Sequence, residues 1–145
     1  MKNKVRERDT RIWVENMQEK ESLKWYREGK RKIQYDQCYR NNFSSKILAK
    51  ARTNTLQVEE AIQRRSREHD KTYRLCGAAE EDLKHFMIEC PRLEGKRNRR
   101  LINKWRNRDK DRQVIDILFK EKDYEKTSQM LRAMWLFRKD LLRPP

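Results

Sequence analysis

Three residues in the middle of the chain have the types and spacing of metal ligands: Cys76, His85 and Cys90. Eight residues separate Cys76 from His85, and four separate His85 from Cys90. Thiolates and an imidazole at such spacings are typical of zinc sites, which need four ligands arranged as a tetrahedron. The position three residues before Cys76, where a second thiolate of the same turn usually lies, is Tyr73. The pattern therefore predicts a Cys-x2-Cys…His-x4-Cys site whose first cysteine is replaced.

Turn and helix signals indicate how these ligands would be positioned. Gly77 predicts a tight turn directly after Cys76. Asp82 is suited to cap a short, mostly apolar helix that carries His85. Cys90 would then lie at the end of the last helical turn, close enough to His85 for both side chains to hold one ion.

The acidic run Glu80-Glu81-Asp82 stands at the positive end of that short helix. Carboxylates at a helix N-terminus interact favourably with its dipole. We therefore expect these three side chains to serve helix stability and solubility, and we keep a catalytic or metal-binding role for them as the alternative.

At these residues the chain resembles the C-terminal tail of non-LTR (LINE-type) retrotransposon reverse transcriptases, downstream of the polymerase. That tail carries a Cys-Cys-His-Cys zinc motif, which Cys76, His85 and Cys90 match, with Tyr73 in the place of the first cysteine. The resemblance spans roughly Ser22 to the end and is specific from Ile47 to Leu93. Within that range three further segments match: Leu48 to Leu56 with its ARTNTL run, Gly77 with the acidic run, and Glu89-Cys90-Pro91.

The resemblance implies a detached module that helps to engage template RNA or target DNA. It implies no polymerase activity, because the paired aspartates, fingers and palm of the polymerase are missing from this sequence. It also implies a zinc-knuckle-like insert that consists of a turn and a short helix.

Tyr73, in the place of the first cysteine, affects whether the site can bind zinc. A phenol has a pKa near 10 and is a poor zinc ligand at neutral pH. We therefore expect Cys76, His85 and Cys90 to pack together without stably bound zinc. Two alternatives remain open: water as the fourth ligand, and His69 as the fourth ligand, which would need a looped backbone.

Composition and charge indicate the class of partner. The chain has 145 residues and a net charge of +15, which favours polyanions, with nucleic acid, RNA or DNA, as the first expectation. Leu, Ile, Val and Phe together number 28, so one modest core is expected. No segment has the length of a membrane span, and the N-terminus does not resemble a secretory signal. Three cysteines favour a reducing compartment, so we expect an intracellular protein, nuclear or cytoplasmic, that is not secreted.

The segment 92–112 is densely basic, with ten Lys or Arg against three acidic residues. Read as one helix, it places Leu101, Ile102 and Trp105 on one face and basic side chains on the other. A merely solvated charge run is the alternative. The residues that we expect to contact phosphates are Lys96, Arg97, Arg99, Arg100, Lys104 and Arg106, with Arg64, Arg65 and Arg67 as a second patch.

The fold expected from these patterns is all-α, a small irregular bundle of about five to seven helices, because no stretch alternates apolar and polar residues for long. We divide it into a charged N-terminal helical arm, residues 1–43, and a helical domain, residues 44–145, that contains the degenerate zinc motif at 73–91. A C-terminal amphipathic helix, residues 124–142, carries Met130, Met134 and Phe137 at helical spacing and is expected to form core or partner surface.

Several activities can be set aside. Three glycines leave no Gly-rich phosphate loop, and no serine lies in a nucleophile elbow. We therefore expect neither catalysis nor a small-molecule substrate. Two hypotheses remain: a nucleic-acid-binding module, and a non-enzymatic helical protein-interaction module or decayed open reading frame whose C-terminal helix finds a protein partner. Salt-dependent binding to nucleic acid would separate them.

Overall fold

The computed structural model describes residues 2–30, 36–66, 74–77 and 80–145, and for residues 2, 3 and 63–65 the backbone alone. Every regular element in these ranges is a helix, which confirms the all-α prediction. The α-helices are α1 (Lys2–Gln18), α2 (Lys24–Gly29), α3 (Phe43–Arg52), α4 (Glu59–Arg65), α5 (Arg99–Lys104), α6 (Lys110–Ile115) and α7 (Tyr124–Leu141). Shorter 3₁₀ or π segments are η1 (Glu21–Leu23), η2 (His85–Glu89), η3 (Pro91–Lys96) and η4 (Asp116–Lys120).

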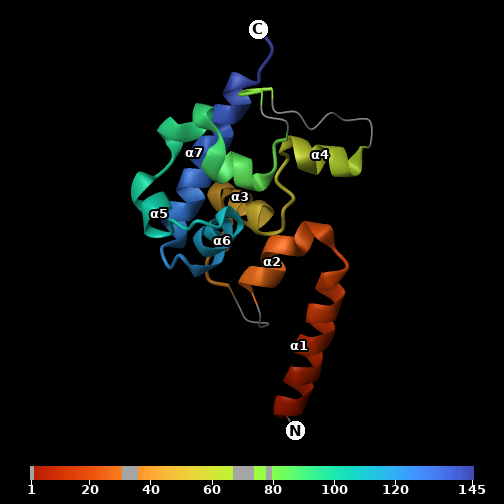
Figure 1. Ribbon diagram of the computed structural model, residues 1–145. Helices are drawn as coiled ribbons and strands as arrows, with labels where there is room; N and C mark the ends of the chain where they lie inside the picture. Colours follow the sequence, from red (N-terminus) through yellow and green to blue (C-terminus); the bar gives the residue numbers. More distant parts are fainter. Residues whose placement is uncertain (1, 31–35, 67–73, 78–79) are drawn as a thin grey trace.

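Helix α7 is the longest helix among the described residues. It lies against α3 and η3 and runs through the body of the molecule (Figure 1). Its apolar stripe points inward, since Met130, Leu131 and Met134 are buried, as the helical spacing predicted. Asp123 caps the helix by accepting a hydrogen bond from the backbone N–H of Lys126.

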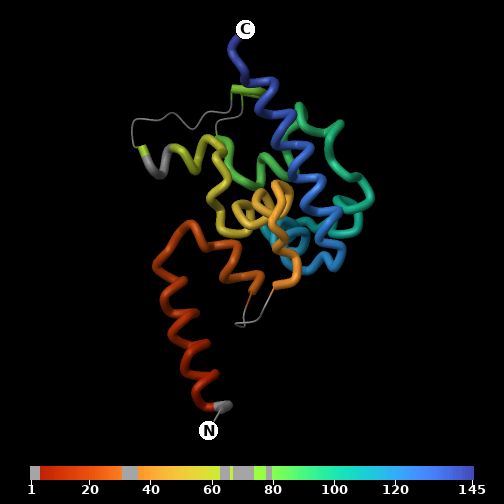
Figure 2. Tube along the Cα trace, turned by 180° about the vertical axis from the view of Figure 1, so that it is seen from behind, coloured from red at the N-terminus to blue at the C-terminus, as the bar shows by residue number. Residues whose placement is uncertain are grey.

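Helix α1 projects away from this body, and α2 returns the chain to it (Figures 1 and 2). Helix α2 packs against α6 and η4. Its last residue, Gly29, lies so close to the ring of Phe119 that a Cβ atom at this position would overlap the ring. Glycine is therefore required here by close packing.

The basic segment does not form the single helix as which we read its periodicity. It is divided into η3, α5 and the start of α6. Asn98 and Asp109 interrupt it, because each accepts hydrogen bonds from backbone N–H groups and caps a new helix, at Leu101 in one case and at Asp111 and Arg112 in the other. The predicted apolar face is correct for α5. Leu101 is buried, and Ile102 packs against the core. Trp105, which follows the last residue of α5, also packs against the core.

Candidate metal centre and basic surface

Cys76 lies in the turn that the sequence predicted. Gly77 has a φ of +70°, in the left-handed region that glycine adopts without strain. The thiol of Cys76 is partly exposed and packs against the edge of the core. Arg74, two residues earlier, reaches back to the carboxylate of Glu59 at 3.3 Å and so ties this turn to the start of α4.

His85 and Cys90 are joined by a single π-turn. Asp82 caps this turn as predicted, because its carboxylate accepts a hydrogen bond of 2.7 Å from the backbone N–H of His85. The backbone N–H of Cys90 donates to the carbonyl of His85 at 2.8 Å, a pairing five residues apart. In an α-helix the hydrogen bond would join residues four apart. The wider π-turn instead places His85 and Cys90, which are five apart, on the same side of the chain.

The three candidate ligands meet at one point. The Sγ atom of Cys76 lies 3.1 Å from Nε2 of His85, and the three ligand atoms, with the Cys90 thiol, are all within 4.8 Å of one another. Ligands around a tetrahedral zinc ion are separated by about 3.5–3.8 Å, given bonds of about 2.0–2.3 Å. The donor set therefore fits such an ion after small shifts, in which Cys76 Sγ and His85 Nε2 move slightly apart from their 3.1 Å separation.

The other nitrogen of His85 faces a carboxylate. Its Nδ1 lies 3.7 Å from Oε2 of Glu89. Histidine ligands in metal sites usually present their second nitrogen to a carboxylate or carbonyl, which fixes the ring and raises its basicity. The side chain of His85 is only 12% exposed, and Cys90 is fully buried, so two of the three ligands are shielded from bulk water. The candidates for the fourth position, Tyr73 and His69, lie outside the described residues.

The basic surface on α5 and beside it retains most of the residues that the sequence singled out. Arg99, Arg100 and Arg106 are exposed, and their guanidinium groups contact no carboxylate within the described parts of the chain. Lys96 is also exposed and places its ammonium group 5.1 Å from the ring centre of Phe137. We call these four residues, Lys96, Arg99, Arg100 and Arg106, the basic face.

The side chain of Lys104 is exposed, but it also forms a salt bridge with Glu121. Its Nζ donates to the carboxylate of Glu121 at 2.8 and 3.1 Å, while the indole N–H of Trp105 donates to the same carboxylate at 2.8 Å. Burial raises the pKa of Glu121, but the hydrogen bonds from Lys104, Asp123 N–H and Trp105 outweigh it and lower the pKa to about 2. Lys104 therefore anchors α5 to the start of α7.

Arg97 corrects the predicted phosphate set. Its side chain is only 2% exposed and donates hydrogen bonds to the carbonyls of Met87 and Phe86 and to the carboxylate of Glu94. A guanidinium with these partners is not available to phosphates. The sequence prediction was wrong here because it counted Arg97 with its basic neighbours. Four residues before Leu101, Arg97 would lie on the apolar side even of one continuous helix.

The second basic patch is described only in part. Arg64 and Arg65 lie in the last turn of α4, for which the backbone alone is described, and Arg67 lies outside the described residues. Their expected contact with phosphates stays a prediction.

A buried charge cluster, which the sequence reasoning missed, includes Glu81, four residues before His85 in the chain. Glu81 is fully buried and receives two hydrogen bonds of 2.6 Å from Arg138 of α7. The same carboxylate accepts from the backbone N–H of Glu59, whose own side chain lies 3.6 Å from Arg138. Burial raises the pKa of Glu81, and the guanidinium of Arg138 opposes this effect. Our expectation that Glu81 serves only solubility and the helix dipole was therefore wrong.

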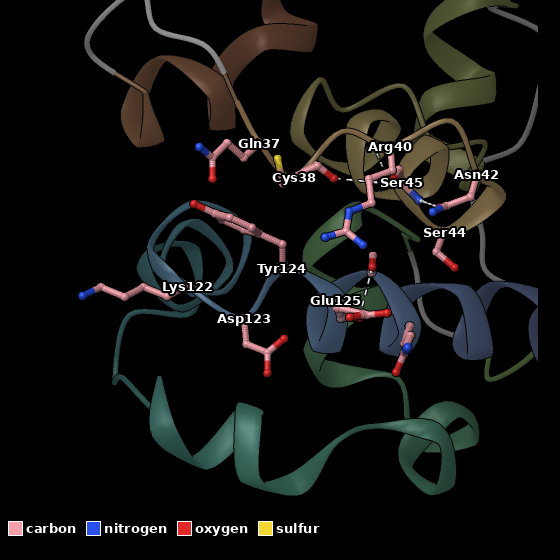
Figure 3. A pocket seen from close by; sticks show the side chains of 12 residues that line it. Gln37, Cys38, Arg40, Asn42, Ser44, Ser45, Lys122, Asp123, Tyr124 and Glu125 are labelled. Carbon is pink, nitrogen blue, oxygen red and sulfur yellow. Dashed lines mark hydrogen bonds between the residues drawn. The ribbon is translucent and has the colours of Figure 1, made fainter.

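A cavity of about 230 Å³ lies elsewhere, between the starts of α3 and α7. Figure 3 shows Arg40 pointing into it from the segment before α3, with Tyr124 and Glu125 of α7 on the opposite wall. Its charged lining residues are Arg40, Lys122, Asp123 and Glu125, so the charges balance. This lining offers hydrogen bonds to a polar group and has no preference for an anion.

Among the described helices, none has the length and apolar character needed to cross a membrane. Comparison with known proteins gave no match: no protein-family model, no curated protein and no solved structure is similar to this chain.

Proposed function

We propose that the chain is a nucleic-acid-binding module that contacts the phosphate backbone through the basic face. The observation that carries this proposal is the exposure of Arg99, Arg100 and Arg106 without a carboxylate partner among the described residues. Arginines without acidic partners retain their full attraction for phosphates, and releasing the counterions of those phosphates drives binding. Buried Leu101 and the Lys104–Glu121 pair hold α5 in place beneath these side chains.

We further propose that Cys76, His85 and Cys90 form a weak zinc site with an incomplete ligand set. The support is the approach of the three ligand atoms and the carboxylate of Glu89 at His85. A zinc ion in this place would supply a structural crosslink between the turn at Cys76 and the π-turn. A complete structural zinc site contributes about 10–16 kcal/mol, so three protein ligands should bind zinc far less tightly than four.

The resemblance to the tail of non-LTR retrotransposon reverse transcriptases agrees with both features, and we propose that origin for the module. In this reading the chain has no catalytic activity of its own, and its nucleic-acid partner is RNA or DNA.

The competing function, a protein-interaction module that acts through the C-terminal helix, has less support. The apolar residues that suggested it, Met130 and Met134, are buried in the core of the domain. Leu136 and Leu141 remain exposed on α7, but scattered apolar side chains are common on the surfaces of monomers.

A salt titration of nucleic-acid binding tests the proposal. The affinity for labelled oligouridylate and for oligothymidylate is measured by fluorescence anisotropy at increasing salt. Each neutralised phosphate contributes about 0.7–0.9 to the slope of log K against log salt, so we expect a slope of roughly −3 to −6. Absence of binding at low salt, or affinity that does not respond to salt, would contradict the proposal.

A further inference from the structure

A side chain of the basic segment holds the π-turn that carries two of the metal ligands. Arg97 donates from Nε to the carbonyl of Met87 at 2.8 Å and from Nη2 to the carbonyl of Phe86 at 3.3 Å. Both carbonyls belong to residues between His85 and Cys90. Because Arg97 is almost completely buried, these charged hydrogen bonds form without competition from water and fix the turn strongly.

The same side chain fixes the backbone from which the basic face begins. Nη1 of Arg97 donates to the carboxylate of Glu94 at 2.7 Å, and the backbone N–H of Arg97 donates to the carbonyl of Glu94 at 3.2 Å. The next residue, Asn98, caps α5, and the first two residues of α5 are Arg99 and Arg100. One guanidinium therefore connects the ligand-bearing turn to the arginines of the basic face, two and three residues further along the chain.

We propose that metal binding at Cys76, His85 and Cys90 is energetically coupled to nucleic-acid binding at the basic face, with Arg97 as the positioning residue that transmits the coupling. This inference rests on the proposed function. Three ligands that share one ion hold the π-turn in one conformation, and its carbonyls then hold Arg97. With Arg97 fixed, the start of α5 is ordered before nucleic acid arrives, and the conformational entropy lost on binding is smaller.

Coupling between two binding sites is reciprocal, and this property gives the first test. The affinity for labelled oligouridylate is measured at one salt concentration, with saturating zinc and with a metal chelator. Separately, zinc affinity is measured by competition with a chromophoric chelator, with and without oligouridylate. We expect zinc to tighten oligouridylate binding by at least about fivefold, and oligouridylate to tighten zinc binding by the same factor. A protein that binds both ligands with independent affinities would overturn the inference.

Variants of Arg97 locate the coupling. Arg97→Met removes all three side-chain hydrogen bonds, and Arg97→Lys retains the charge but not the forked geometry. We expect the coupling factor to fall toward one in both, while each ligand still binds alone. If Arg97→Met does not fold, the coupling factor of Arg97→Lys is the test of the inference. Coupling at the wild-type factor in a folded Arg97 variant would show that another path carries it.

Two controls complete the design. Arg92→Met removes an exposed charge from the same segment, so it should weaken oligouridylate binding slightly and leave the coupling factor unchanged. Cys76→Ser should abolish the effect of zinc, which excludes bridging of protein and oligouridylate by loosely held metal. Failure of the wild-type protein to bind zinc or oligouridylate at all would overturn the proposed function, and this inference with it. Binding of both without coupling contradicts this inference alone.

Discussion

Arg138 and Glu81, 57 residues apart in the chain, form a buried pair joined by two hydrogen bonds of 2.6 Å. Arg138 is 6% exposed and Glu81 is fully buried. The pair connects the C-terminal helix to the segment just before His85. Because Glu59 also lies against Arg138, one guanidinium compensates two buried carboxylates. The exposed Arg74 contacts Glu59 as well.

Removing that guanidinium should be among the most damaging single changes in the domain. Arg138→Met leaves two buried carboxylates without their shared partner, and breaking a buried pair in this way costs about 3–5 kcal/mol. Glu81→Gln should lower the free energy of unfolding by less. The amide still accepts the hydrogen bond from Glu59 N–H, and Arg138 keeps its contact with the carboxylate of Glu59. Chemical denaturation measures both, with Arg132→Met on the exposed side of α7 as the control. A loss below about 1 kcal/mol for Arg138→Met would contradict the assigned role of the cluster.

The Arg138→Met variant should also respond to pH in a defined direction. Without Arg138 only the hydrogen bond from the backbone N–H of Glu59 opposes the effect of burial, so the pKa of Glu81 in the folded variant lies further above its ordinary value of 4.5. A carboxyl whose folded pKa is raised destabilises the fold above that pKa, and the destabilisation fades as pH falls through it. We expect the stability deficit of Arg138→Met to shrink between pH 7 and pH 5. A deficit that grows in this window would be inconsistent with a buried Glu81 carboxylate that has lost its guanidinium partner.

Glu121 should show the opposite pH dependence. Its folded pKa is about 2, below the ordinary value of 4.5, so its stabilising contribution is complete above about pH 4.5 and is lost as pH falls toward 2. Glu121→Gln removes the charge that Lys104 and Trp105 contact, and we expect it to cost about 1–2 kcal/mol at pH 7. Unfolding measured from pH 7 to pH 3 should show the difference between variant and wild type narrowing with acidification. A constant difference would indicate that the charge of Glu121 is irrelevant.

How far the sequence predicts this structure depends on whether a feature is local. The spacing of Met130, Leu131 and Met134 predicted α7 because one helix face must be buried. The turn at Gly77 and the cap at Asp82 were also predictable, since both act within a few residues. By contrast, Arg138–Glu81 pairs residues from distant segments, and nothing in the local pattern distinguishes Glu81 from its exposed neighbour Glu80.

In the basic segment, too, the local pattern predicted only part of the structure. Periodicity placed Leu101 correctly but could not show that Asn98 would start a new helix. Arg97, expected to contact phosphates, is instead buried by hydrogen bonds to the carbonyls of Met87 and Phe86, a contact that the pattern of its own segment does not reveal. The sequence signal that could have revealed the break is the polar residue Asn98 itself, followed by the apolar pair Leu101 and Ile102.

Zinc content should reveal the incomplete ligand set. We expect purified protein to carry well under one zinc per chain in native mass spectrometry, and a chelator to leave its melting temperature almost unchanged. Added zinc should bind with a stoichiometry of one and be lost in His85→Ala. Tyr73→Cys should supply a third thiolate as the fourth ligand, tighten zinc binding strongly and raise the melting temperature. One tightly held zinc per chain in the natural sequence, or no gain from Tyr73→Cys, would contradict the assignment.

The most direct test of the central claim compares two triple variants that lose the same charge. Arg99, Arg100 and Arg106 are changed to Ala in one, and Lys4, Arg8 and Arg11, which are exposed on α1, are changed to Ala in the other. Binding of labelled oligouridylate is measured across a range of salt concentrations. We expect the first variant to lose affinity and to show a salt slope that is shallower by about 2–3, while the α1 variant changes far less. Equal effects of the two variants, or an unchanged slope in the first, would show that the basic face is not the nucleic-acid site.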